Sequence, residues 1–207
     1  MKTRLLTIIA VGISFFFLTA CNENRDVVEI NSALDRVALV QTAVSAFPLD
    51  SIGIVRTRLT EAKDDIKWLA LDSNVVFVKS DAKAVGDLAL ASRYLKDTPG
   101  RISGLVNEIG RCKTQLTGLK EVIELSATLD AKGDTIDDVY LKKNLDIEIE
   151  AVNNLESALF ETSRLIRLGL ETDSASWASI DSLITEKKGL WARGIAGEDN
   201  VIRTHEE

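Results

Sequence analysis

The stretch RISGLVNEIGRCKTQLTGLKEVIELS, residues 101–126, decides the fold of this chain. Its apolar and small residues follow one another at alternating steps of three and four, which is the spacing of a packing face along one side of an α-helix. The members of this face are Ile102, Leu105, Ile109, Cys112, Leu116, Leu119, Ile123 and Ser126. Because the pattern persists over so many turns, it predicts a long helix that packs against other helices.

Both ends of this helix carry boundary signals. Thr98 suits the N-cap, and Pro99 suits the first helical position, where its missing N–H has no partner to lose. Lys132-Gly133 would end the helix, because a cation complements the negative end of the helix dipole and glycine tolerates a positive φ. The sequence therefore predicts a helix over residues 100–132.

Apolar residues at helical spacing continue on both sides of this segment. The other expected helices run from Val27 to just before Pro48, from 50 to about 96, from about 135 to 170, and from the cap Asp173-Ser174 to Gly194. The short connections between them favour antiparallel hairpins. We therefore expect an all-α protein, an elongated antiparallel helical bundle of coiled-coil-like hairpins over residues 27–195, followed by a polar tail over residues 196–207.

The segment 50–96 is ambiguous near its middle. After Leu69 come Asp72-Ser73-Asn74, which are poor helix formers, and then the β-branched and aromatic run Val75-Val76-Phe77-Val78. We interpret the segment as one long helix with a kink near Ser73, and two helices are the alternative. A short strand here would have no evident pairing partner.

Composition excludes several classes of function. The net charge of −7 argues against nucleic acid, whose phosphates need a basic surface. One His and two Cys are too few for a His-rich or Cys-rich zinc site or for a disulfide framework. We therefore expect no metal and no cofactor.

The N-terminus has the features of a targeting signal. Lys2 and Arg4 precede an uncharged apolar run over residues 5–18, which is too short for a comfortable membrane span. The four residues Leu18-Thr19-Ala20-Cys21, at the end of this run, resemble the lipobox of bacterial lipoproteins. An ordinary signal peptide, or an N-terminal membrane helix that happens to precede a cysteine, is the alternative.

The resemblance to lipoproteins implies a specific processing of the chain. Residues 1–20 would be a signal peptide that is removed, and Cys21 would carry diacylglycerol and a further acyl chain of the palmitate type. Residues 21–26 would form a short tether, so that the folded part stays close to the membrane on its extracytoplasmic side. Asn22 after the cysteine resembles lipoproteins sent to the outer membrane, where the host has two membranes.

Each remaining polar candidate has a structural explanation. Cys112 lies on the apolar face and is interpreted as a small buried hydrophobe, and His205 lies in the polar tail. The four Asp between Asp130 and Asp138 do not match a calcium loop, and they suit a helix end with a cap and an acidic first turn. Paired carboxylates such as Glu148 and Glu150 are expected on the solvated face of a helix.

Two further features concern the helix surfaces. Gly104, Gly110 and Gly118 lie opposite the apolar face of helix 100–132, where they indicate either close approach of a partner or tolerated surface glycines. The last helix carries Trp177 and Trp191, but its polar face is not basic as membrane-surface helices are. We therefore expect the two Trp to pack against the bundle.

These observations favour a non-catalytic protein. We interpret it as a lipid-anchored, extracytoplasmic binding or spacer module of the cell envelope, with a protein partner. A carrier of an apolar ligand or lipid in a groove between helices is the alternative. An enzyme ranks third, because long helices with apolar faces rarely form a concave polar pocket.

Overall fold

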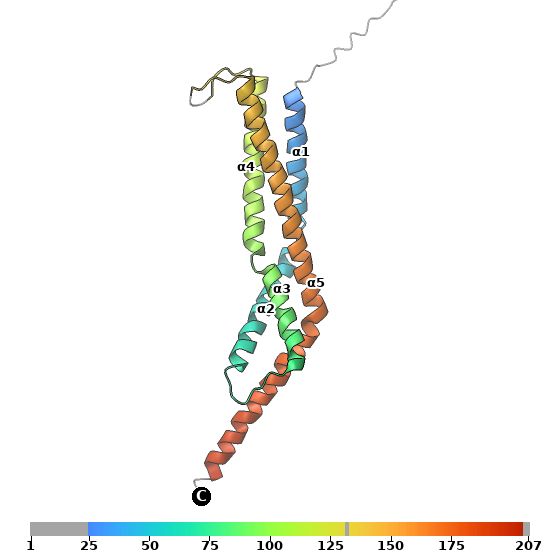
Figure 1. Ribbon diagram of the computed structural model, residues 1–207, viewed down its shortest axis with the longest axis vertical. Coiled ribbons are helices and arrows are strands. Elements are labelled where there is room, and N and C mark those ends of the chain that lie inside the picture. The colour runs from blue at the N-terminus through green and yellow to red at the C-terminus, as the bar shows by residue number, and fades with distance from the viewer. Residues whose placement is uncertain (1–24, 131–132, 205–207) are drawn as a thin grey trace, which may run out of the picture.

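A 67-residue helix, α5 (Asp138–Thr204), runs the length of the computed structural model, which describes residues 25–130 and 133–204 (Figure 1). At a rise of about 1.5 Å per residue, this helix is roughly 100 Å long. The other elements are α1 (Arg25–Ser45), α2 (Leu49–Leu69), the 3-10 helix η1 (Lys79–Asp81), α3 (Ala82–Leu95) and α4 (Thr98–Glu124). No strand occurs within these described ranges, and the predicted all-α class is confirmed.

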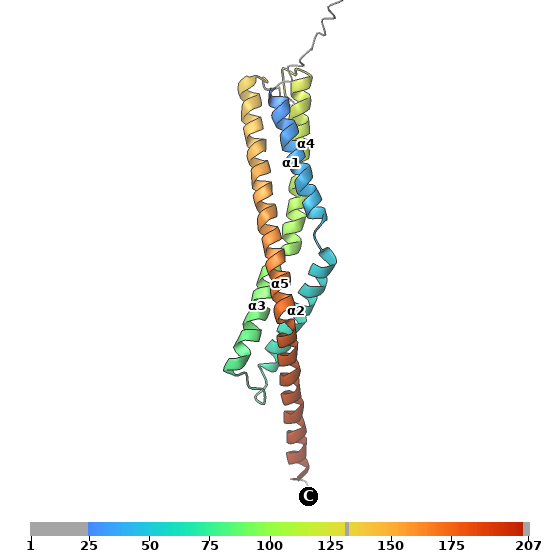
Figure 2. The same cartoon turned by 90° about the vertical axis from the view of Figure 1, so that its right-hand side faces the viewer.

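Two broken legs accompany the continuous helix α5 (Figures 1 and 2). One leg consists of α1 followed by α2 and runs in the same direction as α5, whereas the other consists of α3 followed by α4 and runs in the opposite direction. The first leg breaks at residues 46–48 because Pro48 has no N–H to donate and disfavours a helical Phe47. The second breaks at residues 96–97, just before α4. Thr98 is the first residue of α4 and not its N-cap as predicted, because Asp97 holds the cap position and Pro99 follows in the first turn. The product is an elongated antiparallel bundle, as predicted, but α3 and α4 follow one another in the same direction and do not form the hairpin expected from their short connection.

The half of the molecule that contains the described N-terminus is a three-helix bundle, which we call the upper bundle. α1, α4 and the first half of α5 pack around one apolar core. The core contains most of the apolar face predicted for α4, namely Leu105, Ile109, Cys112, Leu116 and Leu119. Facing them are Ile30, Ala33, Val37, Val40 and Val44 from α1, and Leu145, Val152 and Leu155 from α5. The spacing of residues 101–126 therefore identified the packing face correctly.

The other half, the lower bundle, consists of α2, α3 and the second half of α5. Its separate core is formed by Val55, Leu59, Ala62, Ala84, Leu88, Ala91, Leu95, Ile180, Leu183 and Ile184. Trp177 packs against this core, and the Arg58 guanidinium lies 4.1 Å from the centre of its ring. Trp191 meets Trp68 edge to face at 4.7 Å between ring centres. Both tryptophans of the last predicted helix thus pack against the bundle, as expected.

One glycine is required for the crossing of α3 and α5. A Cβ atom at Gly169 would lie 2.4 Å from Cγ of Leu95, which is a steric overlap with a fully buried side chain. By contrast, a Cβ at Gly104, Gly110 or Gly118 would meet nothing within 4 Å. A side chain would therefore fit at each of the three positions, so packing within the described chain does not require these glycines.

The segment 50–96 is two helices, so the prediction of one kinked helix is wrong and its alternative is correct. α2 ends at Leu69, and no α-helix resumes before Ala82. The Asp72 carboxylate accepts a hydrogen bond from the backbone N–H of Asn74 (2.8 Å), a local turn that competes with helix formation. Val75 is buried, and it holds the connection against the bundle.

The helix predicted over 100–132 ends earlier than expected, at Glu124. Ser126 has a φ of +49°, which stops the helix, and Leu129 then pairs with Thr135 in an isolated antiparallel bridge. Gly133 does adopt a positive φ of +91°, but in the turn between these two residues and not at a helix end. α5 begins at Asp138, three residues later than predicted.

The predicted boundary at Asp173-Ser174 does not exist, because α5 continues through it. The Asp173 side chain is almost fully buried and forms an ion pair with Arg58 of α2, so its carboxylate caps nothing. α5 also continues past Gly194 as far as Thr204, through most of the segment expected as a polar tail. A Cβ at Gly194 would overlap Asn74, which places this region of α5 against the connection between α2 and α3.

Candidate contact surfaces at the two ends

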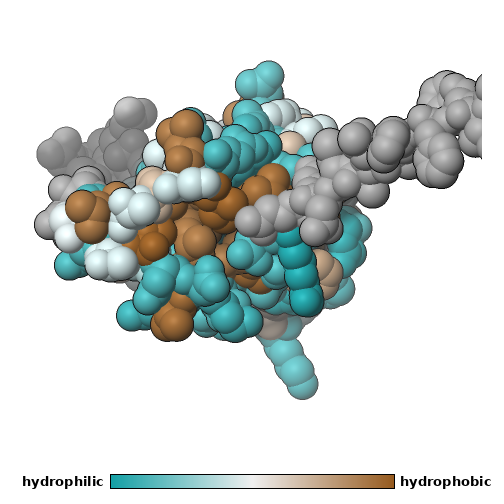
Figure 3. Space-filling view, turned by 90° about the horizontal axis from the view of Figure 1, so that it is seen from above, coloured by the Kyte–Doolittle hydropathy of each residue, from teal (hydrophilic) through white to brown (hydrophobic). Residues whose placement is uncertain are grey.

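The first end of the molecule brings together the start of α1, the end of α4 and the start of α5 (Figures 1 and 2). Four apolar side chains are exposed here, and we call them the N-terminal tip. They are Val28 (47% exposed), Leu125 (79%), Leu129 (58%) and Val139 (74%). Seen from above, apolar side chains lie among hydrophilic ones on this end of the molecule (Figure 3).

Two acidic residues of this end, Asp130 and Asp137, bond to the local backbone. The Asp130 carboxylate accepts hydrogen bonds from the backbone N–H of Asp134 (2.9 Å) and from the Tyr140 hydroxyl (3.4 Å). The Asp137 carboxylate accepts from the N–H of Tyr140 (2.8 Å), which caps the first turn of α5. Burial and the nearby Asp130 raise the pKa of Tyr140. Within the described ranges of the chain, no three His, Cys, Asp or Glu side chains are grouped to hold a metal ion.

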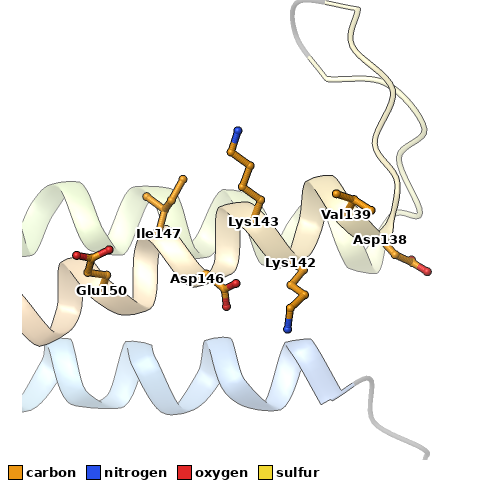
Figure 4. A pocket seen from close by; sticks show the side chains of 7 residues that line it. All are labelled: Asp138, Val139, Lys142, Lys143, Asp146, Ile147 and Glu150. Atoms are coloured by element: carbon orange, nitrogen blue, oxygen red, sulfur yellow. The ribbon is translucent and has the colours of Figure 1, made fainter.

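A shallow hollow of about 560 Å³ lies beside the first turns of α5 (Figure 4). α5 alone lines it, through Asp138, Val139, Lys142, Lys143, Asp146, Ile147 and Glu150. Lys142 and Asp146 point toward α1, whereas Val139, Lys143 and Ile147 point away from it. Because all these groups come from one helix, they form an open surface and not an enclosed pocket.

The second surface is the connection between α2 and α3, residues 70–78, which we call the distal loop. It lies toward the opposite end of the molecule, where the last turns of α5 extend beyond it (Figure 1). Its exposed apolar side chains, with one neighbour from α2, form what we call the distal patch: Trp68 (44% exposed), Leu71 (82%), Val76 (62%) and Val78 (51%). The loop is attached to α5 at its start by the contact between Trp68 and Trp191. An ion pair of Lys188 with Asp65 (2.7 Å) supports the same region.

A buried ion pair holds the other end of the distal loop. Lys187 of α5 and Asp81 of η1 are 2.8 Å apart, with side chains 3% and 11% exposed. The Lys187 ammonium also lies 5.5 Å from the centre of the Phe77 ring. Asp81 in turn accepts from the backbone N–H of Val78 (2.9 Å). The hydrogen bond from Lys187 lowers the pKa of Asp81, and the bond to Asp81 raises the pKa of Lys187.

These shifts predict how the pair responds to pH. Since the pKa of Asp81 is lower in the folded state, its stabilising contribution is present above the unfolded pKa of about 4 and is lost as the pH falls below it. The contribution of Lys187 is complete below about pH 10 and is lost only above that value. We expect Asp81→Asn to lower the midpoint of chemical unfolding at pH 7 and to make progressively less difference at pH 4 and pH 3.

The comparison of Asp81→Asn with the native chain isolates this pair from other carboxylates. Glu108, Glu156 and Glu161 also have a lowered pKa because of hydrogen bonds from arginines, so the native chain will lose stability in acid in any case. Emission from Trp68 and Trp191 reports the region next to the pair. A difference between the variant and the native chain that does not change with pH would contradict the assignment.

The remaining candidates from the sequence are dispersed. Cys112 is fully buried in the upper core, and burial raises the pKa of its thiol. Glu148 does not lie on a solvated face as predicted, because it is 9% exposed and paired with Arg111 (3.2 Å). Cys21 and His205 lie outside the described residues.

Among the described helices, no single one has both the length and the apolar character to cross a membrane. The pair α1 and α2 meets these criteria together, by length and composition only, with a bend of 51° between the two helices. Comparison of the chain with protein families, with curated proteins and with solved structures finds no match.

Proposed function

We propose that this chain is a lipid-anchored, extracytoplasmic protein of the bacterial cell envelope that acts as a non-catalytic binding or spacer module. One observation carries the proposal. The described N-terminus, Arg25, lies at one end of an elongated molecule, and an exposed apolar patch lies on the distal loop, toward the other end. An anchor that precedes Arg25 would therefore hold the distal patch about 80 Å from the membrane, which is the length of α5 from Asp138 to Gly194, the residue that lies against Asn74 of the distal loop.

The anchor itself rests on Leu18-Thr19-Ala20-Cys21, which precedes the described residues. Each buried methylene contributes about 0.8 kcal/mol, so two or three acyl chains on Cys21 would give stable attachment. Attachment also raises the local concentration of the protein at its membrane, so a binding surface there needs only modest intrinsic affinity. The outer membrane is the proposed location if the host has two membranes.

The character of the surfaces supports binding over catalysis. Catalytic sites need several chain segments to converge on a concave pocket that shifts pKa values. The hollow beside α5 is open and belongs to a single helix. A second cavity of about 340 Å³ is lined by α4, the loop after it and α5, but its two carboxylates are engaged, Glu148 with Arg111 and Asp130 with the backbone N–H of Asp134. A binding module needs only an accessible apolar patch, which the distal end supplies.

A carrier of an apolar ligand is the second candidate, and one groove favours it. Between α4 and α5, a groove of about 320 Å³ opens above Gly104 and is lined by Leu105, Leu155 and Ala158 among others. Mass spectrometry of an organic extract of the purified protein distinguishes the two functions. A stoichiometric lipid in the extract would favour the carrier.

Metabolic labelling with a clickable fatty acid tests the anchor. The native protein should incorporate the label, whereas Cys21→Ser should incorporate none and should accumulate as the uncleaved precursor. Cys112→Ser is the matched control, because it removes the only other cysteine of the chain and should keep the label. Label retained by Cys21→Ser would contradict the lipobox assignment.

Crosslinking in intact envelopes tests the binding role of the distal patch. The double variant Leu71→Ser and Val76→Ser should lose its crosslinked partner while remaining folded, since both side chains are mostly exposed. Leu39→Ser, at an equally exposed apolar position on α1, should keep the partner. A non-catalytic role would be contradicted by two results together. The distal double variant would keep its crosslinked partner, and the protein would lose its activity when a buried polar residue is changed.

A further inference from the structure

We propose that the N-terminal tip sits in the lipid interface, with Leu125 and Leu129 dipping between the headgroups, so that the bundle stands end-on on the membrane. The inference rests on the proposed lipidation of Cys21, and it adds the orientation of the protein and its second contact with the bilayer.

The length of the tether limits how far this end can lie from the membrane. Four residue steps separate Cys21 from Arg25, which together span at most about 14 Å when fully extended. Arg25 begins α1 at the same end of the bundle as the loop between α4 and α5 (Figures 1 and 2). A lipidated Cys21 therefore keeps the whole N-terminal tip close to the headgroups.

Hydrogen bonds among the described residues fix the backbone near the two leucines. The N–H of Ile136 donates to the carbonyl of Thr128 (2.9 Å), and Leu129 is bridged to Thr135. Leu125 directly follows α4, and its side chain is 79% exposed. The N–H of Asp130 donates to the carbonyl of Asp134 (2.9 Å) and that of Leu125 to the carbonyl of Glu121 (2.9 Å), so hydrogen bonds next to each leucine fix the backbone that carries it.

The charges at this end favour a neutral lipid surface. Although Lys142 and Lys143 lie in the first turns of α5, more carboxylates lie near Leu129 in the chain, namely those of Asp130, Asp134, Asp137 and Asp138. An anionic surface would repel them, so the apolar contact alone should not recruit the protein. The tip should contact the bilayer only when the acyl anchor holds it there, and most closely on zwitterionic lipids.

The native tryptophans allow a direct test. The chain has three, Trp68, Trp177 and Trp191, all of them in the lower bundle. The mature, lipidated protein would be reconstituted in phosphatidylcholine vesicles whose acyl chains carry bromine, which quenches only tryptophans that reach the lipid. Native emission should be unquenched, and Leu129→Trp should add a blue-shifted component that the brominated vesicles remove.

Leu39→Trp is the matched control, because Leu39 is as exposed as the tip but lies roughly 20 Å along α1 from Arg25. The tryptophan added there should stay unquenched. Quenching at this position, or of the native tryptophans, would mean that the bundle lies on its side, and would overturn the inference.

The same preparation tests the acyl anchor on Cys21 separately from the contact of the N-terminal tip with the bilayer. If the protein lacks the acyl mass and does not float with vesicles, the proposed anchor is wrong. If the protein carries the acyl chains and floats, but the tryptophan of Leu129→Trp is not quenched, the anchor stands and the contact of the tip with the bilayer is refuted. Quenching confined to Leu129→Trp supports the end-on arrangement.

Discussion

Leu116→Ala should lower the free energy of unfolding of the upper bundle by about 2–5 kcal/mol. Leu116 is fully buried among α1, α4 and α5, and truncation would remove packed methylenes and leave a cavity. Glu121→Ala is the control on the same helix, and it should change the free energy by no more than about 0.5 kcal/mol because Glu121 is exposed.

Two optical probes make the Leu116→Ala measurement specific to one half of the molecule. Circular dichroism reports all helices, whereas all three tryptophans lie in the lower bundle. We expect the midpoint of the dichroism curve to fall, with a smaller change in the midpoint seen by tryptophan emission. Equal sensitivity of Leu116 and Glu121 would mean that a partner also covers the outer face of α4.

Ala158→Pro should lower the free energy of unfolding by about 3 kcal/mol or more and should bend the molecule. Ala158 is exposed and lies beside Gly104 and Leu105, close to the start of α4 and hence to the break between α3 and α4. Proline there removes one backbone hydrogen bond and clashes with the carbonyl of Asn154. α5, which unlike the two broken legs has no interruption, would then kink. Small-angle scattering should then show a shorter maximum dimension.

Ala158→Ser provides the control for this substitution. Serine changes the side chain at the same exposed site but keeps the backbone N–H. It should lower the free energy of unfolding by less than about 1 kcal/mol. An unchanged maximum dimension in Ala158→Pro would show that contacts between the two bundles, and not the continuity of α5, set the shape of the molecule.

The fold class and its main packing face were predictable because they depend on local periodicity. Leu105, Ile109 and Leu116 alternate at steps that only a helix can place on one side, and Thr98-Pro99 marks a helix start in almost any context. The confirmed features are therefore those in which a residue and its near neighbours in the sequence carry the whole signal.

The errors arose where a distant partner decides the role of a polar residue. Asp173-Ser174 has the composition of a helix cap, but Arg58, which lies 115 residues away in the sequence, takes the carboxylate into a buried ion pair. Glu148 was assigned to solvent for the same reason, since only the fold shows that Arg111 lies over it. Gly169 is indistinguishable in the sequence from the surface glycines, because its function depends on Leu95.

One missed contact did leave a signal in the sequence. Lys187 stands three residues after Ile184 and four before Trp191, on the apolar face of the last predicted helix. A charged residue at such a position needs a buried partner, which the structure supplies as Asp81. The sequence did not identify Asp81 as this partner. Residues 50–96 were interpreted as one kinked helix, without the distal loop that brings Asp81 to α5.

The direction of the first leg determines how the molecule would respond to a pulling force. Tension applied between Arg25 and Leu71 would pass lengthwise through α1 and α2, with α5 alongside but not in series. The 51° bend at Pro48 would straighten first, because that extension breaks no helix. Further extension would shear α1 past α4 and α5, so that the contacts of its buried face from Val27 to Val44 would resist simultaneously and would not break in succession.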